Sequence, residues 1–361
     1  MARRLELGVS TFGNATVDDR GERDSDARVI RNVVEQAVLA DRLGLDFFNV
    51  GEHHRPEIPL SAPDVVLAAI AGRTERIKLG TAVVVLSTDD PVRVQERFAT
   101  LDAVSGGRAE LTVGRGSFVE SFPLYGFDLK DYDLLFEERL DLLTRLRDQQ
   151  PVTWSGQTRA PLRDVTLYPR VEGGPIPTWV AVGGSPESVV RAARHGLPLM
   201  LAVIGGSARR FRPYVDLYHQ ALAKFGQPEL PVGMHSPGYV ADDAQQARDD
   251  MWEHTRDMLA TIGRERGWPP PTRERFDADI APAGAKYVGT PEQVARSIAA
   301  SIGDLGLSRF ELQYGQGTLP HDKLMRSIEL FATSVVPRVR ELVDEADAAE
   351  PERIPALRGA Q

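Results

Sequence analysis

Three residues that can hold or transfer protons, Glu52, His53 and His54, lie one glycine beyond the apolar segment Phe47–Val50. Adjacent residues of an extended chain point to opposite sides, so the two histidines cannot easily bind one metal ion. The chain has no cysteine and no H-x-x-x-H spacing, and a metal site is therefore not expected. One histidine facing a cavity could act as a general acid or base, because histidine ordinarily titrates near neutral pH. On spacing alone, a pair of hydrogen-bonded structural histidines is the simpler interpretation.

A cation follows a second apolar segment, where Ala109–Gly114 continues into Gly-Arg-Gly-Ser at residues 114–117. An apolar run at Lys78–Leu86 and a helical pattern that begins near Pro91 precede it, which together indicate a strand–helix–strand unit with parallel strands. Ligands bind at the carboxyl ends of such strands, and an arginine can hold a phosphate through two hydrogen bonds. Arg115 therefore predicts an anion site, although an arginine at a strand end can also pair with a surface carboxylate.

The sequence Gly-Gly-Ser-Pro-Glu-Ser at residues 183–188 has the signature of a helix start. Ser185 is a good N-cap and Pro186 suits the first helical position, which leaves free backbone N–H groups and the positive end of the helix dipole for a phosphate. Residues 289–292, Gly-Thr-Pro-Glu, have nearly the same capping chemistry, so a cap alone does not indicate phosphate binding. The double glycine and the additional hydroxyl of Ser188 favour the first of the two helix starts.

Eight apolar segments alternate with helical patterns, which predicts one α/β domain, a (β/α)8 TIM barrel with insertions, over residues 1–345. An open doubly wound sheet is the alternative, but no G-x-G-x-x-G turn follows the first segment. Residues 346–361 are expected to form a flexible tail. The expected strands are Leu5–Thr11, Phe47–Val50, Lys78–Leu86, Ala109–Gly114, Thr178–Val182, Pro198–Ile204, Val232–Val240 and Arg309–Gln313.

Two segments interrupt this alternation. Trp154–Pro177 is rich in proline, arginine and glycine and is expected to make a long excursion before the fifth strand. Gly263–Gly289 has no clean period, and a loop of this length in a compact domain is usually functional or disordered. Its position predicts either an active-site lid or a disordered insertion.

Composition limits the partners and the location of the protein. The 361 residues carry a formal net charge of −9 without a basic patch, so nucleic acid and anionic membranes are not expected partners. The absence of cysteine excludes disulfides, cysteine-ligated metals and a thiol nucleophile. No signal-peptide pattern is found at the N-terminus and no apolar run is long enough to span a bilayer, so a cytoplasmic location is expected.

Two longer blocks carry a family resemblance. GTAVVVLSTDDPVR (residues 80–93) and LDAVSGGRAELTVGRGS (residues 101–117) resemble the bacterial luciferase-like, flavin-dependent monooxygenases, in particular the luciferase catalytic subunit. The pattern continues in GEHH (51–54), GGSPES (183–188), HGLPLM (195–200) and VGTPEQV (288–294), in the family's order. Matching blocks extend from about Leu5 to about Val339, which is nearly the whole chain.

The resemblance implies a function and its cofactor. It implies a monooxygenase that takes reduced FMN from a separate flavin reductase, uses O2 to form a C4a-hydroperoxyflavin and oxidises a small organic substrate. It also implies association, expected here as a homodimer. Two alternatives stay open, hydride transfer with the deazaflavin F420 and a non-catalytic partner subunit like the luciferase β chain. The motifs GEHH, GRGS and GGSPES together weigh against the partner subunit.

The resemblance also implies roles for individual residues. His53 matches the family's catalytic histidine, the acid or base beside the flavin, and Glu52 is delivered to the same site. Ala82 and Val83 match a non-prolyl cis peptide under the flavin ring. The residues that match the binding site of the flavin phosphate are Arg115, Ser117 (through its backbone), Gly184, Ser185 and Ser188.

Two positions depart from the family's pattern. Gly114 stands where luciferase has a reactive cysteine, so no thiol chemistry is expected here. Asp133 stands where luciferase has a second phosphate-binding arginine, which reverses the charge. Lys130 or Arg139 could substitute for that arginine, or the phosphate could be held differently.

Overall fold

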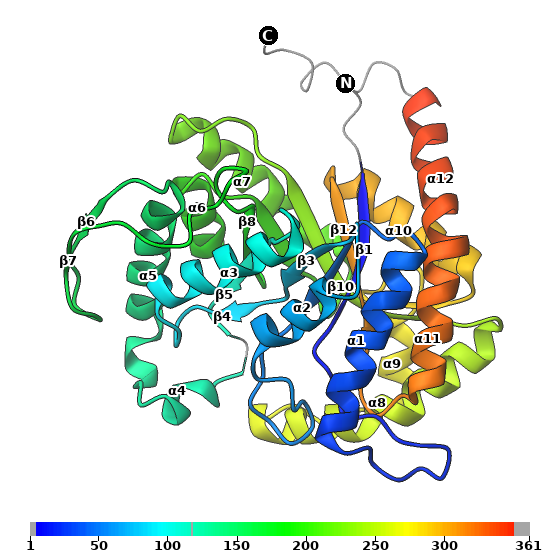
Figure 1. Cartoon of the computed structure of the whole chain (residues 1–361). Helices are drawn as coiled ribbons and strands as arrows, with labels where there is room; N and C mark the ends of the chain where they lie inside the picture. The colour runs from blue at the N-terminus through cyan, green and yellow to red at the C-terminus, as the bar shows by residue number, and fades with distance from the viewer. Residues whose placement is uncertain (1–4, 117, 350–361) are drawn as a thin grey trace.

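The computed structural model describes residues 5–116 and 118–349, which form an α/β barrel (Figure 1). Strands that follow one another in the barrel run parallel, and the last pairs with the first. The expected (β/α)8 TIM barrel is therefore confirmed. Its strands are β1 (Glu6–Thr11), β2 (Phe47–Val50), β3 (Lys78–Thr81) with its continuation β4 (Val84–Val85), β5 (Leu111–Gly114), β8 (Thr178–Val182), β9 (Leu199–Ala202), β10 (Val232–Val240) and β12 (Arg309–Gly315).

Helices cover the outside of the barrel and begin with the capping residues that the sequence predicts. Pro91 opens α3, which ends at Gly106 with a φ of 68°, a conformation that glycine adopts without strain. No helix in the described ranges is long and apolar enough to cross a membrane. The long helices are α1 (Asp26–Arg42), α2 (Pro63–Ala71), α3 (Pro91–Ser105), α5 (Tyr132–Arg147), α6 (Pro186–Arg194), α7 (Arg212–Lys224), α8 (Ala244–Arg266), α10 (Pro291–Leu305), α11 (His321–Leu330) and α12 (Val336–Ala349), and the short ones are α4 (Ser121–Leu124), η1 (Leu129–Asp131), η2 (Ala208–Phe211), α9 (Arg273–Asp279) and the π-helical η3 (Phe331–Val335).

The strand expected at Lys78–Leu86 is two strands with different partners. The first part, β3, pairs with β2, and the second part, β4, pairs with β5. The change occurs just after Thr81, whose hydroxyl donates to the carbonyl oxygen of Thr112 at 2.8 Å and accepts from its N–H at 3.0 Å. These side-chain hydrogen bonds help to close the barrel where the regular ladder stops.

The two interrupting segments contain more regular structure than expected. An antiparallel hairpin begins just before Trp154–Pro177 and extends into it, with β6 (Val152–Trp154) paired with β7 (Leu162–Val165). Although its sequence has no clean period, Gly263–Gly289 contains the end of α8, then α9, then β11 (Tyr287–Gly289), which pairs with β10. The reason is a pair of apolar anchors, Phe276 and Tyr287, each only 3% exposed. The C-terminal helix α12 continues past residue 345 to Ala349, and residues 350–361 lie outside the described residues.

Charged side chains fill the floor of the barrel, at the amino ends of the strands. Arg309 is 1% exposed; it pairs with Glu110 at 2.5 Å, and its guanidinium carbon lies 3.8 Å from the ring centroid of Phe47. Lys78 bridges Glu110 and Glu6 at 2.9 and 2.6 Å. Burial alone would raise the pKa of Glu110, but the charges of Arg309 and Lys78 outweigh it and hold that pKa below its usual value. The floor is therefore a neutralised ionic layer under the barrel core.

We expect Glu110→Ala to destabilise the fold by about 3–5 kcal/mol, because it removes the buried and closer carboxylate partner of Arg309. The comparison variant Glu6→Ala removes a partly exposed carboxylate that pairs with Lys78 and, at 3.6 Å, with Arg309, and it should cost less, about 1 kcal/mol. Urea unfolding of both variants measures the difference. Since the pKa of Glu110 is lowered on folding, this stabilisation is present above its unfolded pKa and is lost as the pH falls through the folded one. Equal stabilities of the two variants at neutral pH would contradict the assignment.

Candidate active site

His53 lies just beyond the carboxyl end of β2, between two aromatic side chains. Its ring centroid is 4.7 Å from that of Phe12 and 5.0 Å from that of Phe118, and the residue is 8% exposed. Its Nδ1 lies 3.7 Å from a carboxylate oxygen of Glu120. Burial by itself would raise the pKa of Glu120, but the interaction with His53 and the charge of Arg55 hold it below its ordinary value. His53 therefore has one carboxylate beside it and aromatic rings on two other sides.

His54 has different surroundings and serves a different contact. Its Nε2 lies 3.1 Å from Oε1 of Glu52, and its ring packs edge-on against Tyr125. The other carboxylate oxygen of Glu52 accepts the backbone N–H of Val85 at 2.9 Å. Glu52 therefore ties the segment after β2 to β4, and His54 holds that carboxylate in place. The described residues contain no group of three or more His, Cys, Asp or Glu side chains that could hold a metal ion.

The peptide bond between Ala82 and Val83 is cis, as the resemblance implies. Its neighbours are glycines that leave room for it. A Cβ on Gly114 would lie 2.9 Å from a methyl carbon of Val83, and a Cβ on Gly51 would lie 3.1 Å from the carbonyl oxygen of Ala82. The glycine that replaces the family's cysteine thus has a packing role here, because any side chain at residue 114 would press on Val83.

Arg115 leaves the end of β5 toward the start of α5. It forms an ion pair with Asp133 at 2.8 Å, and its guanidinium lies over the ring of Tyr132. Tyr132 in turn donates to the carbonyl oxygen of Gly116 at 2.8 Å, which fixes the turn after the strand. The next predicted site residue, Ser117, lies outside the described residues.

The start of α6 lies beside Arg115, because β5 and β8 are neighbours in the barrel. Ser185 caps the helix by accepting the N–H of Ser188, and Gly184 has a φ of 117°, which a residue with a side chain rarely adopts. Ser188 is 4% exposed, and its hydroxyl lies 3.4 Å from that of Ser185. The described residues of this end of the barrel therefore bring together a cation, two hydroxyls and a helix start, which is a donor set suited to a phosphate.

The two substitutes expected for the missing family arginine have other roles. Lys130 pairs with Asp128 at 3.0 Å on the surface. Arg139 is buried, donates to the carbonyl oxygen of Ser87 at 2.6 Å and stacks over Phe127. These contacts hold both side chains in other places, so neither Lys130 nor Arg139 is seen to replace the missing arginine beside Arg115.

Sequence reasoning did not find two residues that the structure brings to these sites. Glu120 carries no motif, although it follows the Gly-Arg-Gly-Ser block by only three residues. Arg191 lies on α6 three residues after Ser188, and its Nη1 donates to the Ser188 hydroxyl at 3.3 Å. The helical spacing of three residues is the signal that could have shown Arg191 on the same face as Ser188.

The end of α8 reaches the same rim and contacts the surroundings of His53. Glu265 accepts two hydrogen bonds from Arg55, at 2.8 and 2.5 Å. The guanidinium carbons of Arg55 and Arg266 lie 5.1 and 4.9 Å, respectively, from the ring centroid of Phe118. The beginning of the segment predicted as a lid or an insertion is thus tied to the rim by charge and by cation–π contacts.

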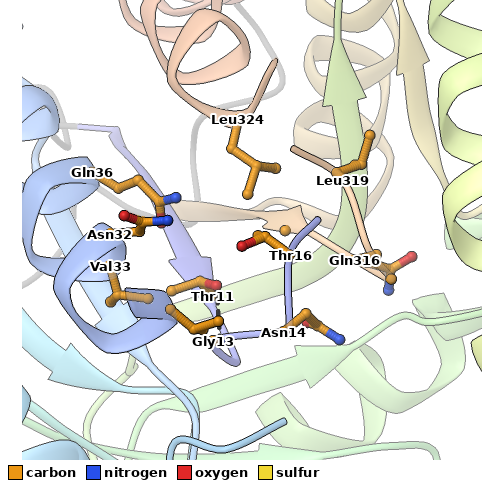
Figure 2. A pocket seen from close by; sticks show the side chains of 13 residues that line it. Thr11, Gly13, Asn14, Thr16, Asn32, Val33, Gln36, Gln316, Leu319 and Leu324 are labelled. Atoms are coloured by element: carbon orange, nitrogen blue, oxygen red, sulfur yellow. Dashed lines mark hydrogen bonds between the residues drawn. The ribbon is translucent and has the colours of Figure 1, made fainter. Parts of the chain in front are cut away.

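A pocket lies behind the end of β1, between α1 and the segment after β12 (Figure 2). Its lining mixes uncharged polar side chains with apolar ones, and the buried amide atoms Oδ1 of Asn14 and Nδ2 of Asn32 have no hydrogen-bond partner. It includes none of the residues that the resemblance implies. We therefore place the candidate active site at the rim around His53 and Arg115, and not in this pocket.

Comparison with known proteins shows which class of protein this chain belongs to. Residues 6–309 match the model of the luciferase-like monooxygenases, and the chain belongs to this family. It is an oxidoreductase of the monooxygenase class. The chain is 33% identical over 310 residues to the N-acetyl-S-alkylcysteine monooxygenase of Bacillus subtilis, covering 80% of this chain and 88% of the relative. It is 29% identical over 343 residues to the 4-hydroxyprotoasukamycin monooxygenase of Streptomyces nodosus subsp. asukaensis, covering 88% of both.

Solved structures share the fold over nearly the whole chain. The monooxygenase RslO1 of Streptomyces bottropensis has a TM-score of 0.78 at 26% identity, over 92% of this chain and 99% of its own. Two more distant structures carry different cofactors. One is the oxygenating constituent of 3,6-diketocamphane monooxygenase from a Pseudomonas putida plasmid, in complex with FMN, with a TM-score of 0.74, 17% identity and coverage of 93% and 98%. The other is an F420-dependent secondary alcohol dehydrogenase with an F420–acetone adduct, with a TM-score of 0.73, 17% identity and coverage of 93% and 99%.

We expect Arg115→Ala to weaken FMN binding by about tenfold to a hundredfold and to leave riboflavin binding unchanged, because charge-assisted hydrogen bonds to the phosphate are lost. Riboflavin has the same ring without the phosphate, so the ratio of the two dissociation constants isolates the phosphate contact. Fluorescence titration of both flavins measures it. Arg145→Ala, an exposed arginine paired with Asp141 on α5, is the control and should leave the ratio unchanged. Equal losses for both flavins would remove Arg115 from the phosphate site.

Proposed function

We propose that this monooxygenase binds reduced FMN delivered by a separate flavin reductase and uses O2 to oxidise a small organic substrate. The observation that carries the proposal is the order of groups along four neighbouring barrel positions. Next to β2 lie Glu52 and His53, after β3 lies the cis peptide, after β5 lies Arg115, and after β8 lies the Ser185 helix start. A proton-transfer group, a flat backbone surface and a phosphate donor set thus follow one another around the rim.

The groups at the two ends of this series of strand ends fit the two ends of a flavin nucleotide, its phosphate and its planar ring. Arg115, Ser185 and Ser188 offer charge and hydrogen-bond donors to a phosphate. At the other end, the peptide between Ala82 and Val83 is flanked by close-packed glycines, which leaves backbone and apolar surface under a planar ring. When bound, reduced flavin supplies the electrons that activate O2. The route through a C4a-hydroperoxyflavin stays a prediction, as do the homodimer and the cytoplasmic location.

His53 is the residue we assign to proton transfer. Its Nδ1 faces Glu120, which leaves Nε2 as the ring atom able to exchange a proton with a bound group. The lowered pKa of Glu120 keeps this carboxylate ionised near neutral pH, so it can orient the imidazole ring. Phe12 and Phe118 keep water away from two sides of the ring. The contact of Arg55 with Glu265 holds the end of α8 over the same place, which supports a lid role for this segment.

Hydride transfer with F420 is the second candidate, because one of the similar structures is an F420-dependent dehydrogenase. A direct experiment separates the two. Protein with FMNH2 under anaerobic conditions is mixed with O2, and the absorbance is followed in time. A long-lived species distinct from oxidised FMN, together with weak F420 binding, supports the monooxygenase reaction with FMN. No such species, together with tight F420 binding, would assign hydride transfer, and binding of neither cofactor would assign a non-catalytic subunit.

We expect His53→Ala to lower the rate of product formation by about 10²–10⁴-fold, the usual contribution of a general acid or base. FMN binding should persist, because the phosphate contacts lie on other strands. The pH profile of turnover should also lose one limb. His54→Ala is the matched control, since it removes a neighbouring imidazole that holds Glu52, and it should mainly lower stability. Rates are compared at saturating FMNH2 and substrate; normal turnover by His53→Ala alongside a slow His54→Ala would reverse the assignment.

A further inference from the structure

A second arginine lies beside the proposed phosphate site. The side chain of Arg191 is 11% exposed, and two helices hold it in place. Its Nη1 donates to the Ser188 hydroxyl on α6, its Nε pairs with Glu137 of α5 at 2.5 Å, and its guanidinium carbon lies 5.5 Å from the ring centroid of Phe136. These contacts fix the position of the guanidinium before any ligand binds, which lowers the cost of ordering it on binding.

Glu137 does not neutralise this arginine completely. The same carboxylate pairs with Arg194, one helical turn further along α6. Two guanidinium groups therefore share this one carboxylate, and the charges of Asp133 and Glu187 also act on Arg191. Arg194 is much more exposed than Arg191, with 46% of its side chain accessible, so Arg191 is the cation of this pair that matters for a buried ligand.

Arg191 and Arg115 belong to the same cluster. Burial lowers the pKa of Arg191, and the positive charge of Arg115 lowers it further. The positive charges of both arginines also act on the Glu187 carboxyl and the Tyr132 hydroxyl, and in each case they favour the ionised form. Two cations that repel each other are stabilised by an anion that contacts both, and a phosphate supplies enough oxygens to accept hydrogen bonds from both.

We propose that Arg191 is the second phosphate-binding cation of this protein and that Asp133 competes with the phosphate for Arg115. The inference rests on the proposed function, since the ligand is the phosphate of FMN. Arg191 thus takes the place of the arginine that residue 133 lacks, but from α6 rather than from α5. Asp133 is paired with Arg115 and is 74% exposed, so an incoming phosphate displaces it into solvent at little cost. The site then binds FMN but holds it loosely, as suits a flavin that is exchanged with a reductase.

The test compares FMN with riboflavin by fluorescence titration of the full-length protein. Arg191→Gln should weaken FMN binding by about tenfold or more while riboflavin binding changes less than about twofold. Asp133→Asn should tighten FMN binding by about two- to fivefold and leave riboflavin unchanged. Arg194→Gln is the matched control on the same helix with the same carboxylate partner, and it should change neither dissociation constant by more than about twofold. Riboflavin binding and thermal unfolding check that each variant is folded.

The outcomes separate this inference from the proposed function. If the unsubstituted protein binds FMN and riboflavin equally, the phosphate site itself is wrong and FMN use fails with it. If the protein prefers FMN, and Arg115→Ala abolishes the preference but Arg191→Gln keeps it, only the role of Arg191 is overturned. Arg191→Met, which keeps the packing over Phe136, replaces Arg191→Gln should that variant not fold. Unchanged FMN affinity in Asp133→Asn overturns the competition.

Discussion

The geometry of the rim depends on the hydrogen bond from the N–H of Val85 to the carboxylate of Glu52. At Val85 the chain has left β2 and joined β5, so the strand ladder on the β2 side no longer supplies an acceptor for this N–H. A buried N–H without an acceptor would cost roughly 1–3 kcal/mol, and Glu52 provides one from just beyond β2. His54 holds the second oxygen of the same carboxylate. His53 lies between Glu52 and His54 in the chain. Because both neighbours are held in place, the backbone of His53 is fixed and its side chain points away from theirs.

Local rules of sequence predicted much of this arrangement. The capping residues Pro91 and Ser185 start helices where their chemistry requires, and the strands Phe47–Val50, Thr178–Val182 and Val232–Val240 have the predicted bounds. These features depend on a few neighbouring residues or on a continuous apolar run, which a single sequence displays. The place of Arg115 at the end of a parallel strand follows from the same reasoning. Its ion pair with Asp133 agrees with the less specific of the two interpretations of this arginine, and a phosphate would have to compete with that pair.

The remaining features depend on contacts between distant segments. Nothing near residue 120 shows that its carboxylate meets His53, because the two are joined only by the closure of the barrel. The same holds for Arg191, whose partners Glu137 and Phe136 lie on another helix. The hairpin of β6 and β7 and the ordered segment around Phe276 were missed because each is held by one or two apolar anchors and has no period. Sequence therefore predicted the strand ends of the candidate site but not the side chains that reach them from elsewhere.

The ionic floor of the barrel has a consequence for the sequence of binding events. Arg309, stacked between Phe47 and Trp179, fills the amino end of the barrel, so ligands cannot pass through it. In the function proposed above, flavin, organic substrate and product would then all enter and leave at the opposite rim. A flavin ring on the Ala82–Val83 peptide would lie deeper than a substrate stacked above it. Binding would consequently be ordered, with the flavin first in and last out, and an excess of substrate would block the flavin's entry.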